Sequence, residues 1–342
     1  MDSFSLELNE KYGSVVLPSI LISDDLPNDN QISADLWISR EAPFGIPQHW
    51  RDWIGSLKIE SIEKASLFLL TKKHSKHPDH LDEDNEICKK RVGSFYWGLL
   101  LTGFVNCYEK PFSLTGAKWD DGIDVRQLGD FNQPRLPIGL LPENIGIERL
   151  REAAQIANLL PSLDGPGRFD RFSRILHSFY AGLLDHNPAS SLHQFVRCIE
   201  GFIYPTTGKT KNQFCSRTEI FLGTRHHSLA AQLYNIRSSI EHLHDPFRDI
   251  KENTERKKRL ILLQRSIEAE AIARFCIKRA LTRKDIHKWF ENDDKITEFW
   301  KLDTDKRQKI WGAPMSIIDV SSKFREDFVS DEELGLWSEP HR

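Results

Sequence analysis

Hydrophobic and polar residues follow two different patterns along the chain, and the change falls near residue 145. In the first part, short β-type apolar runs at residues 14–17 and 19–22 end at turn residues. Helical candidates in this part cover residues 59–70 and 86–107. Residues 1–145 are therefore predicted to form a mixed α+β domain of unknown role.

Beyond a Gly- and Pro-containing stretch at residues 136–142, apolar residues recur at helical spacing. The predicted helices cover residues 147–160, 168–184, 190–203, 216–222, 227–243 and 253–282. Their short connections favour antiparallel neighbours. Residues 146–290 are thus predicted to form a helical bundle, and residues 291–342 a charged tail that docks on the body through tryptophans such as Trp300, Trp311 and Trp337. The chain as a whole is predicted to be mainly α.

Composition narrows the class of protein. Of 342 residues, 39% are hydrophobic and 28% charged, as in an ordinary folded chain. The formal charge of −3 means that any nucleic-acid surface must be local. The longest apolar stretch, residues 95–105, is shorter than the roughly 20 residues that span a bilayer, so no membrane partner is expected. The first residues lack the pattern of a secretory signal, and a cytoplasmic location is expected.

The cysteines and one histidine-rich segment bear on metal binding. Five cysteines are scattered and never form a CxxC pair, which argues against a disulfide framework or a zinc ribbon. His74, His77 and His80 precede Cys88, a spacing that allows a metal site. Because Pro78 breaks the helix that would bring these side chains together, a mobile polar loop without metal is predicted.

Residues 227–245 carry the strongest pattern. Apolar residues at steps of four and three line one face of a predicted helix that packs into the bundle. They are Leu229, Leu233, Ile236, Ile240 and Leu243. Arg237 lies at the edge of this face, His242 and His244 follow it, and Pro246 is expected to stop the helix.

The sequence Tyr-Asn-Ile-Arg-Ser-Ser-Ile-Glu-His at 234–242 resembles the Arg-x4-6-His signature of the HEPN superfamily, in particular its Apea-like branch from prokaryotic anti-phage systems. Upstream, residues 192–200 are similar to the helix in which that branch carries an apolar-Glu pair. Residues 214–217 resemble its short Arg-bearing helix. Order and spacing agree over about residues 165–285.

The resemblance implies a four- or five-helix up-and-down bundle in a homodimer whose motif helices face each other. It also implies a metal-independent endoribonuclease without a cofactor, in an anti-phage or toxin-like role, and it allows an antitoxin or defence-system partner. RNA supplies its own nucleophile, the ribose 2′-OH. Cleavage therefore needs a group near neutral pKa to move a proton and a cation to hold the phosphate.

For this chain, the resemblance implies that Arg237 binds and stabilises the scissile phosphate and that His242 transfers the proton. Ser238 and His244 are expected to position them. The supporting residues are Glu200, Arg217 and Tyr234.

Simpler interpretations remain open for the same residues. A histidine in the last turn stabilises a helix end, and Arg237 can pair with Glu200 or Glu241. Glu200 and Arg217 can also form a buried ion pair that braces the bundle. The second functional hypothesis is accordingly a non-catalytic HEPN module that binds a nucleotide, RNA or a partner protein.

One basic region follows the motif. Residues 248–284 contain twelve Lys or Arg and five Asp or Glu, a large excess in a chain of net charge −3. A solvated helix face is one interpretation. The other is a track for the RNA backbone, with Lys257, Lys258 and Arg259 as the binding residues.

Overall fold

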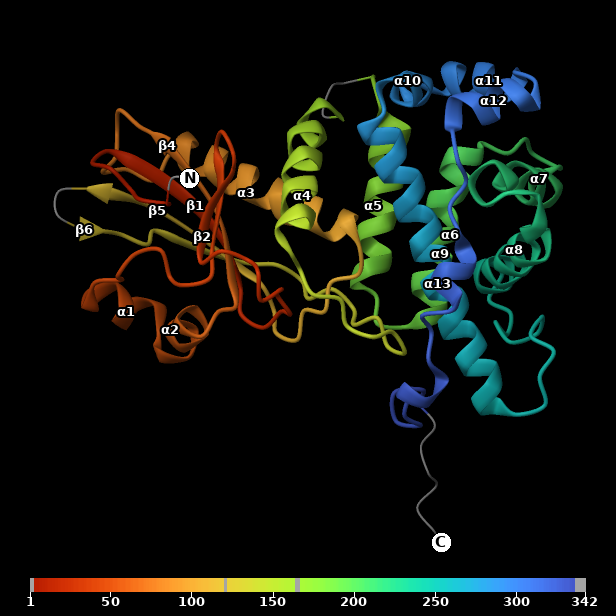
Figure 1. Cartoon of the computed structure of the whole chain (residues 1–342), viewed down its shortest axis with the longest axis horizontal. Coiled ribbons are helices and arrows are strands. Elements are labelled where there is room, and N and C mark those ends of the chain that lie inside the picture. Colours follow the sequence, from red (N-terminus) through yellow and green to blue (C-terminus); the bar gives the residue numbers. More distant parts are fainter. Residues whose placement is uncertain (1–2, 120–121, 164–166, 336–342) are drawn as a thin grey trace, which may run out of the picture. The chain divides into compact units, whose positions relative to one another are not determined.

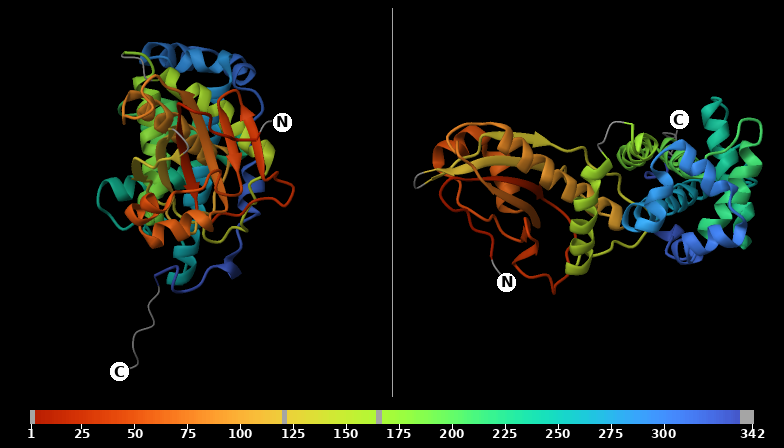
Figure 2. Two further views of the ribbon diagram at one scale, coloured as in Figure 1. Left: turned by 90° about the vertical axis from the view of Figure 1, so that its left-hand side faces the viewer. Right: turned by 90° about the horizontal axis from the view of Figure 1, so that it is seen from above.

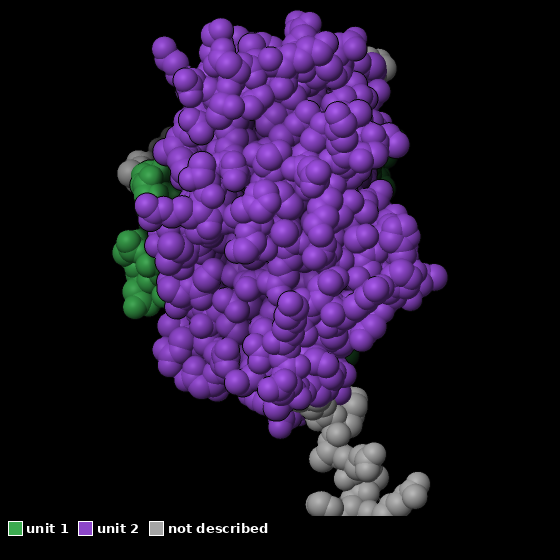
Figure 3. Space-filling model, turned by 90° about the vertical axis from the view of Figure 1, so that its right-hand side faces the viewer, with its two compact units in different colours: residues 1–136, 142–160 green, residues 137–141, 161–342 purple. Residues whose placement is uncertain are grey.

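The chain divides into two compact units (Figures 1 and 3). The computed structural model describes residues 3–119, 122–163 and 167–335. Residues 1–136 with 142–160 form the first unit, and residues 137–141 with 161–342 form the second. The described part is mainly helical, as predicted, and its antiparallel sheet lies in the first unit. Among the described helices, none has the length and apolar character needed to cross a bilayer.

The first unit is built on a seven-stranded sheet within the described residues. The strands are β1 Glu10–Leu17, β2 Asp29–Ser33, β3 Leu36–Ser39, β4 Leu67–His74, β5 Phe112–Trp119, β6 Gly122–Ile123 and β7 Gln127–Asp130. Their order is β2-β3-β4-β1-β5-β6, with β7 also paired to β5. All pairs are antiparallel. The central strand β1 is buried on both faces, because each face of the sheet is covered.

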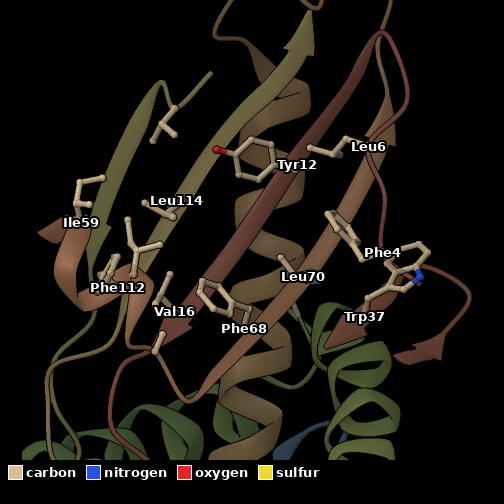
Figure 4. Close-up of a cluster of buried hydrophobic side chains, with 13 residues drawn as sticks. Phe4, Leu6, Tyr12, Val16, Trp37, Ile59, Phe68, Leu70, Phe112 and Leu114 are labelled. Carbon is tan, nitrogen blue, oxygen red and sulfur yellow. The ribbon is translucent and has the colours of Figure 1, made fainter. Parts of the chain in front are cut away.

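Helix α3 (Glu83–Thr102) lies along one face of the sheet (Figure 2). Asp82 caps its first turn by accepting a hydrogen bond from the backbone of Asp84. A Cβ at Gly13 of β1 would lie 2.7 Å from the carbonyl of Cys88, so the glycine lets the helix approach the strand closely. On the other face, Tyr12, Val16 and their neighbours form an apolar cluster (Figure 4) with α2 (Ser56–Glu63), which follows α1 (Gln48–Ile54).

Helix α4 (Ile147–Leu159) belongs to the first unit, so the boundary predicted near residue 145 comes one helix too early. Its buried face packs on α3 at Gly98, where a Cβ would lie 2.3 Å from the carbonyl oxygen of Ala153. The pattern of α4 is helical, like that of the bundle that follows. Periodicity alone could not show which unit α4 joins.

Two predictions in the first unit were wrong in type. The predicted helix 59–70 is α2 followed by strand β4, because the run Leu-Phe-Leu-Leu at 67–70 is buried on both sheet faces and its short apolar pattern fits either structure. The run 19–22 is not a strand and makes isolated bridges through Ile20 and Ile22. The predicted strand 14–17 lies within β1.

The second unit is helical and centres on one helix. Its main helices are α5 Asp170–Leu184, α6 Pro188–Ile203, α7 Thr210–Leu222, α8 His227–Glu241 and α9 Glu255–Thr282. These agree with the predicted helices, except that α7 begins earlier and α8 ends earlier. Helix α6 packs against α5, α7, α8 and α9 (Figure 1). Pro188 at its first position and the Asn187 cap fix where it begins.

The charged tail is part of the second unit. It contains the short helices α11 Asp293–Lys301, α12 Thr304–Trp311 and α13 Ile317–Ser321, and the four-residue helix α10 (Lys284–His287) lies between α9 and the tail. Trp311 is fully buried, and the indole N–H of Trp300 donates a hydrogen bond to the carbonyl of Phe202 on α6, 3.0 Å away. Trp337 lies outside the described residues.

The contact between α3 and α4 predicts the effect of one substitution. Gly98→Ala should lower the free energy of unfolding by about 1–3 kcal/mol, because the added methyl overpacks the contact. Helix propensity alone predicts the opposite sign. Urea unfolding measures the change. The matched control is Gly45→Ala, since a Cβ there meets nothing within 4 Å. A stabilised Gly98→Ala protein would contradict this packing.

Candidate functional site at the end of helix α8

Helix α8 ends earlier than Pro246 requires. The backbone N–H of His244 donates to the carbonyl of Ser239 and that of Leu243 donates to the carbonyl of Ile240, a pattern that closes a helix end. Leu243 takes the left-handed conformation this closure needs, with φ 57°, a position usually held by glycine. Leu243 is therefore not part of the apolar stripe: its side chain is 94% exposed, whereas Leu233 and Ile236 are buried.

The early end of α8 brings two histidines together. His242 and His244 are exposed, and their ring centroids are 6.1 Å apart. Neither imidazole forms a hydrogen bond or ion pair with another described residue. Ser238 accepts the backbone N–H of His242 through its carbonyl and so takes part in the helix end. An imidazole ring has nitrogen atoms that can accept and donate a proton, so two exposed rings at one point suit proton transfer.

Arg237, one turn before the end of α8, is held by two carboxylates. Its guanidinium lies 3.0 Å from Glu200 of α6 and 3.8 Å from Glu241, one turn along α8. Only 19% of the Arg237 side chain and 12% of the Glu200 side chain are exposed, so the pair is largely shielded from water. Arg237 Nε has no acceptor among the described residues. The two ion pairs thus fix the guanidinium in place.

His193 of α6 completes this network, and the sequence analysis missed it. Its Nε2 is hydrogen-bonded to a carboxylate oxygen of Glu241, and this bond lowers the pKa of Glu241. His193, Arg197 and Glu200 stand four and three residues apart, which places them on one face of α6. That polar stripe on an otherwise apolar helix was the signal that could have found His193.

Glu200 is the residue of this network whose charged form burial disfavours. Burial raises the pKa of Glu200, while the charges of Arg237 and Arg197 oppose the rise. One of its oxygens, Oε1, is buried and has no hydrogen-bond donor among the described residues. Arg237 therefore contributes to stability by compensating a buried carboxylate.

The alternative in which Arg217 pairs with Glu200 is wrong. Arg217 donates to the carbonyls of Ile203 and Tyr204, at 2.7 and 2.9 Å, and so caps the end of α6. Its guanidinium also lies over the ring of Trp300, 4.8 Å from the centroid. The spacing of Arg217 could not show that a helix end needed its donors more than Glu200 did.

Tyr234 is half-buried on α8 and packs its ring against Phe214 of α7, with centroids 5.6 Å apart. This contact joins the motif helix to its neighbour. It gives Tyr234 a structural place in the bundle.

Fewer cationic side chains of the basic stretch are available for a ligand than its composition suggests. Six of its arginines bind carboxylates or carbonyls: Arg256, Arg259, Arg265, Arg274, Arg279 and Arg283. Arg259 donates to Glu255 and to the carbonyl of Leu334, and thereby holds the C-terminal segment. Lys257 is exposed and Lys258 half-buried, and the side-chain ammonium group of neither has a partner in the described ranges.

The histidine-rich segment is a loop between β4 and α3. Lys11, itself fully buried, donates to the carbonyl of His80, and Arg126 donates to the carbonyls of Pro78 and His80. The loop is thus anchored through its backbone. Cys88 is buried, and burial raises the pKa of its thiol to about 12. In the part of the chain that the structure describes, no three His, Cys, Asp or Glu side chains form a metal-binding group.

Comparisons of the chain with protein-family models, curated proteins and solved structures find no match. The function is therefore argued from the geometry and chemistry of this site.

The Arg237–Glu200 pair predicts a pH-dependent loss of stability. Arg237→Met should lower the free energy of unfolding by roughly 1–3 kcal/mol at pH 8, because it leaves the Glu200 carboxylate buried and unpaired. Without Arg237 the pKa of Glu200 in the folded state rises further above its ordinary value of 4.5. The deficit should therefore be small below that value, where Glu200 is protonated in both states, and grow as the pH rises through the folded-state pKa.

Urea unfolding from pH 4 to 8 measures this effect. The control is Glu200→Gln in the Arg237→Met background, which removes the stranded charge and should recover most of the loss at pH 8. A deficit that is equal at pH 4 and pH 8 would mean that the pair does not act through the charge of Glu200.

Proposed function

We propose that the second unit is a metal-independent endoribonuclease of HEPN type, with an anti-phage or toxin-like role. The observation that supports this best is a pair of exposed imidazoles, His242 and His244, that have no partner among the described residues and directly follow the helix whose Arg237 is fixed by Glu200. These are the residue types that cleavage by an internal nucleophile requires. The antiparallel helices around α6 are consistent with the proposed bundle.

In the proposed reaction, the ribose 2′-oxygen forms a bond to the adjacent phosphorus and the bond to the 5′-oxygen breaks. His242 accepts the 2′-OH proton, and the His242 imidazole of a second copy of the chain donates a proton to the leaving 5′-oxygen. Arg237 stabilises the charge that develops on the phosphoryl oxygens through the part of its guanidinium side chain that stays exposed to solvent, about a fifth of it. Ser238 and His244 hold the end of α8 in place.

The working unit is proposed to be a homodimer with a composite site. One arginine and one helix end are a small set of groups for this reaction, whereas a two-fold axis would place two copies around one cleft. Leu243, almost wholly exposed between the two histidines, offers an apolar contact for such an interface.

A second candidate function is a non-catalytic module that binds a nucleotide, RNA or a partner protein. It is favoured by the contacts of Arg237, whose guanidinium already faces two carboxylates. Activity measurements separate the two functions.

The purified protein should cleave RNA in the presence of EDTA. His242→Ala should abolish cleavage and leave the unfolding midpoint unchanged, because the side chain is exposed and unpartnered among the described residues, and His244→Ala should have a smaller effect. The matched control is His186→Ala, an exposed histidine in the connection between α5 and α6, which should keep full activity. Wild-type activity in His242→Ala would remove this residue from the site.

Lys257 and Lys258 of the basic stretch should contribute to the affinity for RNA. Lys257→Gln with Lys258→Gln should weaken RNA binding for all sequences and flatten its salt dependence, since phosphate contacts release counterions. Arg259 is left intact because it holds the C-terminal segment. Binding titrations at several salt concentrations measure the slope, and an unchanged slope would leave a solvated face as the only role.

The composite site predicts the behaviour of mixed dimers. A dimer with one wild-type and one His242→Ala subunit should be strongly impaired, because both chains supply groups to one cleft. Sedimentation should show a dimer at the assay concentration. A monomer that cleaves RNA at full rate would contradict the composite site.

A further inference from the structure

A hollow of about 260 Å³ lies in the groove between α5 and α6, beside the network of Glu200 and Arg237. Its main lining residues are Arg171, Arg174 and Ser178 of α5 and Arg197, Glu200 and Gly201 of α6. The residues from α5 stand three and four apart, so they share one face of that helix. The hollow therefore concentrates three guanidinium groups at one point of the second unit.

The packing of the two helices creates this space. A Cβ at Gly201 would lie 2.4 Å from Ile175 of α5, so the glycine lets the helices approach closely and leaves the groove above it without a side chain. The long arginine side chains form the walls. At about 260 Å³ the hollow is smaller than the roughly 300–1,000 Å³ of pockets for drug-sized ligands, and suits a group such as a phosphate.

The charges of the hollow are unequally matched. Arg171 makes two hydrogen bonds to Asp293, at 2.6 and 2.8 Å, and stacks on the ring of Tyr204. Glu200 forms an ion pair with Arg237. Arg174 and Arg197 are exposed, and neither has an ion pair or hydrogen bond within the described ranges. Each carboxylate near the hollow thus has a closer partner, while Arg174 and Arg197 act on Asp293, Glu200 and Glu241 only through their charge, without an ion pair or hydrogen bond among the described residues.

We propose that this hollow binds a phosphate group, held by Arg174 and Arg197 and carried by a ribonucleotide or an RNA strand. Guanidinium groups offer planar pairs of donors that match phosphate oxygens, and an anion between two like charges relieves their repulsion. Arg171, fixed by Asp293 and Tyr204, is the rigid wall against which the anion rests. His242 is not among the residues that line the hollow, and phosphate binding there does not depend on RNA cleavage.

The test is isothermal titration of the full chain with inorganic phosphate, at an ionic strength held constant with chloride. Arg174→Gln and Arg197→Gln should each raise the Kd for phosphate at least about tenfold, because each removes a charge-assisted contact. Both side chains are exposed and make no ion pair or hydrogen bond among the described residues, so the unfolding midpoint in chloride should change little. The larger of the two small shifts is expected for Arg197→Gln, which removes a charge that acts on Glu200. The matched control is Lys309→Gln, an exposed and unpartnered lysine of α12 in the described chain, which should keep the wild-type Kd.

Two further ligands identify the source of the phosphate. Adenosine 5′-monophosphate that binds at least about tenfold more tightly than phosphate, through the same arginines, would assign the site to a mononucleotide. Displacement of phosphate only by a 2′-O-methyl RNA strand, which lacks the nucleophile for cleavage, would assign it to the RNA backbone. His242→Ala should bind phosphate as the wild type does, so the failure of the proposed nuclease leaves this result intact. Absence of phosphate binding, or an equal loss in Lys309→Gln, would overturn the proposal.

Discussion

The geometry of the site depends on one constraint, which is that the carboxylate of Glu200 lies inside the bundle and needs a cation. Glu200 belongs to α6, the helix against which α5, α7, α8 and α9 all pack. Arg237 supplies the cation from α8 at 3.0 Å, and the same guanidinium faces Glu241. The pair therefore ties the end of α8 to the centre of the unit, since separating them would leave a buried charge uncompensated.

This anchoring separates a rigid interior from an open surface. Within α6 and α8, His193, Glu200, Arg237 and Glu241 are linked to one another. After the end of α8, His242 and His244 are exposed and have no partners among the described residues. A site that holds a phosphate and moves protons requires both properties, because the cation must be preorganised and the imidazoles must be accessible.

The sequence predicted the helices of the second unit well, because their apolar residues recur at helical spacing over many turns. It failed at residues 67–70, where four consecutive apolar residues fit a strand and a helix equally, and at α4, whose pattern does not show which unit it joins. The exposed histidines followed from the motif. The pairing of Arg237 with Glu200 was one of two alternatives that the sequence left open for Glu200. The sequence could not decide between Arg237 and Arg217, because helix packing determines which cation reaches a buried carboxylate and which one caps a helix end.

The measurement that tests the nuclease most directly is the chemistry of the cleaved ends. Attack by the 2′-oxygen must leave a 2′,3′-cyclic phosphate on one fragment and a 5′-hydroxyl on the other. An RNA that carries a single 2′-deoxyribose at the cleaved position must then resist cleavage, with EDTA present throughout. Products of this kind, together with resistance of the deoxy substrate, are the predicted result. Fragments ending in a 3′-hydroxyl, or cleavage of the deoxy substrate at the wild-type rate, would contradict the account.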